Sequence, residues 1–411
     1  MPEFLNLLPP SKALELFLKN LPEKRLPIER VSSVQALGRI IGTTIYSPEN
    51  SPAFNRSTVD GYAVMALDTY GASEAQPAYL KIAGEVRMGE KAEIALQFGS
   101  CALIHTGGML PAEADAVVMV EHTQLVTDHE VEILRAAAVG DNVIKIGEDI
   151  KEGEVIFNAG DVVTPAVAGS LLAVGLSEID VYQKPRVGII SSGDEVVSPD
   201  QLPVHGQVRD INSYTLSALV ENEGGVAKHY GIQPDDFEVM SVTFRQALHD
   251  CDLVLITAGS SASTRDLTAA VIQTMGPPGV LVHGVNVKPG KPTILAGCQG
   301  KPVLGLPGNP VSALVIARRF LRPVIHKLSG RKSSAGTFSK TAELSVNLSS
   351  SSGREDWVPV RLIERDGILF ADPIFYKSNL IFNLAHADGL ILIPEDANGL
   401  AAGSLIEVYP L

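Results

Sequence analysis

Two lysines and four prolines lie close together in residues 280–320 and could form a site for an oxyanion. Lys288 and Lys291 belong to the loop sequence KPGKP, and a second loop, LPGNP, follows at residues 306–310. Proline fixes φ and glycine permits positive φ, so these loops combine stiffness with close approach of a ligand to the backbone. An apolar helical pattern begins at Val311, and free N–H groups at a helix start favour an anion. The pattern favours an oxyanion or phosphate site, with ordinary Gly/Pro turns as the alternative.

Acidic side chains follow several apolar runs between residues 185 and 328. The run KPRVGIISSGDEV carries Glu195 near its end, VRDIN places Asp210 before a helical pattern, and a helix is expected to begin near Asp266. Alternating strands and helices predict a doubly wound sheet, which binds ligands at its carboxyl edge. A carboxylate such as Glu195 would repel a bare phosphate. It fits a divalent ion, a protonated partner or a neutral ligand edge such as a pterin amide.

Polar residues also gather in the first half of the chain. The loop SPENSPAFNRSTVDGYAV carries Ser57 and Asp60, which either form an Asp-Gly turn or project into a ligand cleft. Short strands with Gly breaks between residues 79 and 134 predict a β domain, with Thr106 after one strand. Asp149, in an acid-rich segment, could be a metal or proton partner or a surface carboxylate. Three histidines share no metal-ligand spacing and are expected to be structural or exposed: His105, His122 and His129.

The elements that must position these residues are predicted from periodicity and end signals. Helices are expected at Ser11–Leu21 with Ser11 as the cap, at Ser32–Ile41 with Ser33 as a candidate cap, and at Pro165–Val174. After Gly330, short alternating strands predict a small β domain or barrel up to residue 411. Arg354 lies in a loop of this region, where it either reaches an anion or is solvated.

Composition limits the classes of function. A chain of 411 residues suggests about three domains. A hydrophobic content of 45% with 19% charged residues indicates folded cores. The formal net charge of −14 argues against binding nucleic acid or an anionic membrane. Three scattered cysteines suggest a reducing cytoplasm, with neither a zinc site nor a disulfide framework. No signal peptide and no bilayer-spanning run is expected.

Taken in order, several segments resemble one family, the molybdopterin molybdenumtransferases of the MoeA type, which include the E domain of gephyrin. The likeness covers essentially the whole chain. It rests on eight segments: PAFNRSTVDGYAV, HTGGMLPAEADAVV, NVIKIGEDIKEGE, SSGDEV, GQVRDIN, VKPGKP, GLPGNPVSA and ADGLILIPE.

The resemblance implies a multidomain α/β plus β fold in an elongated homodimer. Residues 1–53 and 141–178 would form a split helical domain, with a β domain of residues 54–140 inserted in it. Residues 179–329 would form the doubly wound molybdenum-cofactor-type sheet domain, and residues 330–411 a C-terminal β barrel.

The resemblance also implies a reaction. The family takes adenylylated molybdopterin and molybdate, cleaves the pyrophosphate linkage with Mg²⁺, releases AMP and leaves molybdenum on the pterin dithiolene. Transient contacts with the molybdopterin adenylyltransferase and with apo-molybdoenzymes would follow. The family's catalytic set matches Asp60, Thr106, Asp149, Glu195, Asp210 and Asp266, of which Glu195, Asp210 and Asp266 would bind the metal. The substrate-binding set matches Ser57, Lys288, Lys291, Pro292, Pro307, Pro310, Ser312, Arg354 and Ser378.

Two segments depart from the family pattern, and two other functions stay open. TAGSSASTRD is shorter and richer in serine than the usual loop, which shifts the match at Asp266. KSNLIFNLAH, with Lys377, stands where a glycine- and serine-rich stretch is usual. The alternatives are a non-catalytic gephyrin-like scaffold and a related phosphoanhydride hydrolase.

Overall fold

The chain divides into two compact units. A computed structural model describes residues 7–23, 25–258, 262–332, 339–375 and 377–411, without the side chains of residues 258 and 262–266. One unit comprises residues 1–29, 38–42 and 181–411, and the other comprises residues 30–37 and 43–180. None of the described helices is long and apolar enough to cross a membrane.

The larger unit contains a mixed six-stranded sheet in the order β16-β13-β17-β21-β20-β18. The first four strands run parallel, and β20 is antiparallel to both of its neighbours. The strands are β13 (Arg186–Ser192), β16 (Val226–Gln233), β17 (Leu253–Ala258), β18 (Pro278–His283), β20 (Ile294–Cys298) and β21 (Lys301–Pro307). Because Ser191 pairs with Thr257 and Ala258 with Pro307, these three strands end at one edge.

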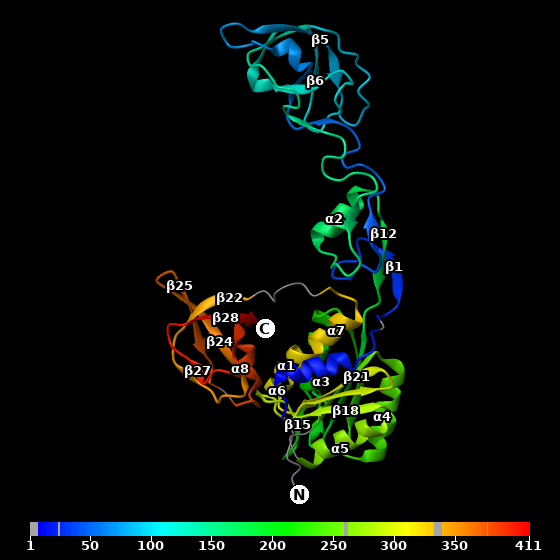
Figure 1. The fold of residues 1–411 in the computed structure, drawn as a ribbon, viewed down its shortest axis with the longest axis vertical. Helices are drawn as coiled ribbons and strands as arrows, with labels where there is room; N and C mark the ends of the chain where they lie inside the picture. The colour runs from blue at the N-terminus through cyan, green and yellow to red at the C-terminus, as the bar shows by residue number, and fades with distance from the viewer. Residues whose placement is uncertain (1–6, 24, 259–261, 333–338, 376) are drawn as a thin grey trace. The chain divides into compact units, whose positions relative to one another are not determined.

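Helices cover both faces of this sheet (Figure 1). They are α1 (Pro10–Lys19), α3 (Asn212–Asn222), α4 (Phe237–Asp250), α5 (Ala262–Thr274), α6 (Pro310–Ile316) and α7 (Arg322–Leu328), with a π-helical turn η3 (Ala317–Leu321) between the last two. Side chains alternate across β13: Ile189 packs in one core with Phe17 of α1, and Ile190 packs in the other with Phe244 of α4. The predicted doubly wound sheet is confirmed.

A closed five-stranded sheet forms the C-terminal part of the same unit. Its strands pair in the cycle β24-β25-β22-β28-β26-β24 around an apolar core that contains Leu344 and Ile391. They are β22 (Lys340–Leu344), β24 (Glu355–Arg365), β25 (Ile368–Pro373), β26 (Gly389–Ile393) and β28 (Leu405–Pro410). The short strand β19 (Val287–Lys288) pairs with the start of β24, so the KPGKP loop adjoins the barrel. The predicted barrel is confirmed.

The smaller unit is built on a second six-stranded sheet, in the order β7-β4-β6-β5-β9-β8. Successive residues of β4 enter opposite cores: Tyr62 and Val64 on one face and Ala63 on the other. This sheet confirms the inserted β domain. Its strands are β4 (Gly61–Val64), β5 (Ala78–Val86), β6 (Ser100–Ile104), β7 (Ala116–Met119), β8 (Thr123–Thr127) and β9 (Glu130–Ile133), with the 3₁₀ turns η1 (Ala66–Thr69) and η2 (Val120–His122).

The remaining elements are short. Helix α2 (Pro165–Ala173) has Thr164 as its cap, whose hydroxyl accepts the Val167 N–H, so this predicted helix is confirmed. Two-stranded ladders join β1 (Ile28–Ser32) to β12 (Glu178–Tyr182), β2 (Ile45–Tyr46) to β11 (Val155–Phe157), β3 (Arg56–Ser57) to β10 (Val143–Ile144), β14 (Val196–Val197) to β15 (Val208–Arg209) and β23 (Leu348–Ser349) to β27 (Gly399–Leu400). Helix α8 (Ile381–Ala385) lies in the departing segment KSNLIFNLAH.

One predicted helix is wrong and two helix starts are displaced. Residues 32–41 form the end of β1 and a series of turns, because the buried Ser33 bonds to Leu176 and Ser177 and Gly38 has a positive φ of 75°. Helix α1 begins at Pro10 without a side-chain cap, so Ser11 is not its cap. Helix α5 begins at Ala262, one turn before Asp266.

Candidate functional site

Asp60 and Thr106 are brought together in the smaller unit by neighbouring strands. Asp60 immediately precedes β4 and Thr106 follows β6, and these strands pair Gly61 with Ile104. Thr106 donates its N–H to Asp60 Oδ1 at 2.7 Å and its hydroxyl at 3.1 Å. Both bonds favour the charged form of Asp60 and therefore hold its pKa below the ordinary value. The bond from the backbone N–H has the larger effect. Asp60 is therefore an exposed carboxylate that stays ionised near neutral pH.

Ser57 fixes the loop that carries Asp60. Its buried hydroxyl donates to the Val59 carbonyl at 2.6 Å, and its backbone exchanges hydrogen bonds with Gly107 and Gly108. Such side chain-to-backbone bonds define a tight turn. The hydroxyl of Ser57 therefore stabilises the turn, and its binding to a substrate stays a prediction.

His105 is a neighbour of Asp60 that the sequence interpretation left as structural or exposed. Its Nδ1 lies 3.9 Å from Asp60 Oδ1, and its Nε2 lies 2.9 Å from Glu85 Oε1. The half-exposed imidazole thus stands between two carboxylates. The position of His105 directly before Thr106 in the sequence could have indicated that it lies near Asp60.

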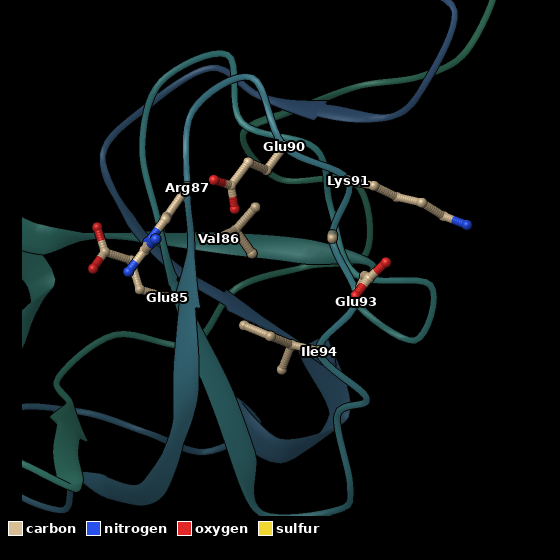
Figure 2. Close-up of a pocket in the computed structure, with 8 residues that line it drawn as sticks. Glu85, Val86, Arg87, Glu90, Lys91, Glu93 and Ile94 are labelled. Atoms are coloured by element: carbon tan, nitrogen blue, oxygen red, sulfur yellow. The ribbon is translucent and has the colours of Figure 1, made fainter.

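Glu85 also borders a hollow of about 390 Å³ formed by the loop after β5 (Figure 2). The charged side chains that line the hollow include Arg87, Glu90 and Glu93. The side chain of Lys91 points away from the other labelled side chains. No group of three or more His, Cys, Asp or Glu side chains able to hold a metal ion occurs here or elsewhere among the described residues.

Asp149 lies on a loop beside the segment that leads to Asp60. Its N–H donates to the Ser51 carbonyl at 3.0 Å, and nearby the Ile146 N–H donates to Asn55 Oδ1 at 2.8 Å. Its exposed carboxylate makes no contact with Asp60 in the described structure. The two predicted catalytic carboxylates share a loop region without a direct bond.

Asp210 is the most constrained of the predicted acids. It is buried between β13 and α3, where its Oδ2 accepts the hydroxyls of Ser191, at 2.7 Å, and Ser213. Its Oδ1 accepts the Ser213 N–H at 3.1 Å, which satisfies a donor in the first turn of α3. The carboxylate therefore ties a strand end to a helix start.

Glu195 and Asp266 complete the predicted metal set. The Glu195 backbone carbonyl accepts the Val208 N–H at 2.8 Å, whereas its half-buried carboxylate has no partner among the described side chains. The side chain of Asp266 lies outside the described part of the chain, so the three-carboxylate metal site stays a prediction.

Lys288 and Arg354 meet at a third residue, Asp356, that was not predicted. Asp356 is buried, with 4% of its side chain exposed, and it receives Arg354 Nε at 2.6 Å and Nη2 at 2.9 Å. Lys288 Nζ lies 3.9 Å from Asp356 Oδ2. Arg354 is thus held rather than freely solvated. The spacing of Arg354 and Asp356 was the available signal, because residues i and i+2 of a strand share a face.

Gly290, between the two lysines, packs against α6. Its φ is +121°, and a Cβ added there would lie 2.3 Å from Ile316 Cγ1. Thr293 donates its hydroxyl to the Gly290 carbonyl at 2.6 Å. Pro292 is half-buried beside Lys291, which is exposed and whose ammonium has no partner among the described residues. The loop is therefore fixed while Lys291 projects from it.

The second loop, LPGNP, contacts Ser378 from the departing segment. Asn309 Nδ2 donates to Ser378 Oγ at 3.0 Å, and the Val311 N–H donates to the Ser378 carbonyl at 3.2 Å. One N–H at the start of α6 is therefore already occupied. Pro307 ends β21, Pro310 begins α6, and Ser312 is buried in the first turn of that helix.

These contacts define an α/β protein with a cation-bearing loop and a serine-rich, acid-rich edge at the ends of the parallel strands of one mixed sheet. Models of three regions match the chain: the MoeA N-terminal region (domain I and II) at residues 8–175, the probable molybdopterin binding domain at 188–327 and the MoeA C-terminal region (domain IV) at 341–411. The chain belongs to the MoeA family.

Relatives along nearly the full length agree with that assignment. The chain is 33% identical to molybdopterin molybdenumtransferase 2 of Mycobacterium tuberculosis, over 93% of this chain and 94% of that protein. It is 30% identical to the molybdopterin molybdenumtransferase of Haemophilus influenzae, over 93% of each chain. Crystal structures of Pyrococcus horikoshii molybdopterin biosynthesis MoeA proteins match with TM-scores of 0.80 and 0.84 at 37% and 30% identity. Both matches cover 98% of this chain, and 99% and 100% of the respective crystal chains.

Proposed function

We propose that this protein is a molybdopterin molybdenumtransferase of molybdenum cofactor biosynthesis. In the proposed reaction the pyrophosphate linkage of adenylylated molybdopterin is cleaved, AMP leaves, and molybdenum from molybdate remains on the pterin dithiolene. The observation that carries the proposal is the KPGKP loop, which holds Lys288 at the Arg354–Asp356 pair and leaves Lys291 free among the described residues. The names of the relatives support the same reaction.

The cationic loop suits an oxyanion substrate. A dianion such as molybdate gains most from ammonium and guanidinium donors whose positions are fixed before it binds. Gly290 and Thr293 fix the backbone between the lysines, and Asp356 orients Arg354. Lys291 then supplies positive charge that no described carboxylate offsets.

The acidic side chains at the sheet edge are of the chemical type that binds magnesium. Magnesium is commonly held by one or two carboxylates together with substrate phosphates and water. Glu195, which has no described partner, and Asp210, through its Oδ1, would hold it. When bound, the ion would offset charge that develops as the phosphoanhydride breaks.

Asp60 is better suited to a fixed negative charge than to proton abstraction. A general base works best with a pKa near the operating pH, whereas the Thr106 bonds lower the pKa of Asp60. It would therefore accept hydrogen bonds and orient a donor of the substrate. Asp60→Asn is expected to slow AMP release in a single turnover.

The direct test is incubation with adenylylated molybdopterin, magnesium and molybdate while AMP is followed. Lys291→Ala is expected to raise the molybdate concentration for half-maximal rate by about 10- to 150-fold, since a hydrogen bond to a charged group contributes about 1.5–3 kcal/mol. Lys340→Ala, an exposed lysine at the start of β22, is the matched control. No AMP release by the wild-type protein would reject the transferase, and equal responses of both variants would remove Lys291 from the oxyanion site.

We also infer that the protein works as a homodimer in the cytoplasm, with transient contacts to the molybdopterin adenylyltransferase and to apo-molybdoenzymes. The family resemblance supports these three inferences. Light scattering of the purified protein tests the dimer, because a mass near the 43.6 kDa of one chain would contradict it.

A further inference from the structure

A second cavity, of about 670 Å³, lies between the α6–η3–α7 segment and the C-terminal barrel within the larger unit. This volume is typical of sites for small organic ligands. Its walls differ in character. One is basic and comes mainly from the helical segment, and the other is apolar and comes mainly from β24, β26 and β28. The lining residues used below are Arg318, Arg319, Arg331, Trp357, Leu390 and Tyr409.

The basic wall carries more positive charge than the carboxylates described in the structure neutralise. It holds four arginines and one lysine, Lys327, against two carboxylates that contact them, Glu355 and Glu223. Arg319 Nε bonds to Glu355 at 3.3 Å, and Arg331 bonds to the ring of His326 at 3.2 Å. The described carboxylates therefore leave three of these positive charges without a counter-charge, in a chain whose formal net charge is −14.

Arg318 shows this excess most clearly. Its guanidinium donates to the Pro410 carbonyl and to none of the described carboxylates. Burial, together with the nearby charge of Arg322, lowers the pKa of Arg318 despite the opposing charge of Glu223. A desolvated cation with no anion in contact would be stabilised by an anionic ligand.

The apolar wall presents aromatic rings. Trp357 and Tyr409 meet edge to face, with ring centroids 5.8 Å apart, beside Leu390. Aromatic and aliphatic side chains of this kind bind the flat face of a ligand ring.

Strand β24 separates this cavity from the proposed oxyanion site. Glu355 and Trp357 line the cavity, whereas Arg354 and Asp356 meet Lys288. Alternate residues of a strand point to opposite faces. None of the residues predicted to bind molybdate or pterin lines the cavity.

We propose that this cavity is a second ligand site, which binds a small phosphate ester carrying an aromatic ring, of the nucleoside monophosphate class. The phosphate lies against Arg318 and Arg331, and the ring lies against Trp357 and Tyr409. Phosphate is bound strongly by guanidinium groups because their N–H donors match its oxygens in pairs. The site is separate from the proposed transferase reaction.

Fluorescence of Trp357 tests the site directly, since it is the single tryptophan of the chain. The full-length protein is titrated with inosine monophosphate, inosine and inorganic phosphate. The inosine base keeps the probe distinct from the adenylyl group of the proposed reaction. We expect a saturable change with inosine monophosphate, and at least about tenfold weaker binding of the two fragments, because each reaches only one wall.

Variants locate the binding energy. Arg318→Gln and Arg331→Gln are each expected to weaken inosine monophosphate binding about tenfold. Arg365→Gln is the matched control, because Arg365 pairs with Asp372 on the same barrel and does not line the cavity. Arg331→Gln keeps the test valid should Arg318→Gln fail to fold.

Three results would overturn the proposal. They are the absence of a saturable change in Trp357 fluorescence, equal affinity for inosine monophosphate and either fragment, and unchanged affinity in Arg331→Gln. AMP release is assayed separately, so failure here leaves the proposed function standing.

Discussion

Gly290→Ala is the substitution whose effect follows most directly from the geometry. The added Cβ would lie 2.3 Å from Ile316 Cγ1 and 2.5 Å from Ile316 Cδ1, at a φ of +121° that L-residues rarely adopt. Backbone strain of this kind costs about 1–3 kcal/mol. Overpacking adds about 1–3 kcal/mol. We therefore expect a loss of roughly 2–6 kcal/mol in the free energy of unfolding of the larger unit.

Urea unfolding followed by Trp357 fluorescence reports on this unit, because Trp357 lies in β24. With a urea dependence of a few kcal/mol per molar, the midpoint should fall by about 1 M. AMP release should fall as well, since the clash displaces the backbone between Lys288 and Lys291. Gly403→Ala is the matched control: its φ is +81° and its nearest atom, Glu343 Oε1, is 3.7 Å away.

A double-mutant cycle separates the clash from the strain. Ile316→Ala alone should cost about 2–5 kcal/mol, because it leaves a cavity. Combined with Gly290→Ala, the loss should be smaller than the sum by about the overpacking energy, 1–3 kcal/mol. Equal midpoints for Gly290→Ala and Gly403→Ala, or strict additivity in the cycle, would refute the reasoning.

Three further outcomes are expected. Arg354→Ala should lower the free energy of unfolding by about 3 kcal/mol, measured in urea, because it removes the bidentate partner of the buried Asp356. Thr106→Val should raise the pKa of Asp60 part of the way toward its ordinary value, measured by ¹³C NMR, because it removes the hydroxyl bond and keeps the backbone N–H bond. The lowered folded-state pKa stabilises the fold above the ordinary value of 3.8, and this contribution is lost as the pH falls through the folded value. The thiol of Cys101, whose pKa burial raises to about 12, should resist maleimide at neutral pH in the native protein.

Each of these outcomes has a control. Arg365→Ala removes a more exposed ion pair and should cost less than about 1 kcal/mol. Thr106→Ser keeps a hydroxyl donor and should leave the pKa of Asp60 low. In denaturant all three cysteines should react. A loss as small for Arg354→Ala as for Arg365→Ala, an unmoved Asp60 titration in Thr106→Val, or rapid native labelling would each contradict the corresponding argument.

The sheet and barrel could be predicted because their signals are local. Runs such as VGII of β13 and VLGLP of β21 are continuous and apolar, as is typical of strands buried on both faces. The prediction of a helix at residues 32–41 was wrong because long-range contacts decide the conformation of this segment. Its pattern is short, and bonds from Ser33 to residues 176 and 177, far along the chain, decide its conformation.

The sequence predicted which kinds of residue lie at the candidate site much better than it predicted which side chains contact one another. Lys288, Lys291 and Arg354 could be named as candidates from loop sequence and family resemblance, and their role toward a substrate stays a prediction. That Lys288 lies near Asp356 and that His105 stands beside Asp60 depends on strand register, which the sequence encodes only through long-range pairing. The hydrogen bonds from the Ser191 and Ser213 hydroxyls to Asp210 form because α3 packs against β13.

The charges around Asp356 explain how an acidic chain can present cations to an oxyanion. Asp356 is nearly buried, and it would be costly there without Arg354. With Lys288 also near it, the three charges leave one positive charge in excess, and Lys291 adds a second. A dianion matches this excess. Because the Arg354–Asp356 bonds need not break, an oxyanion can bind and leave while the start of β24 stays in place.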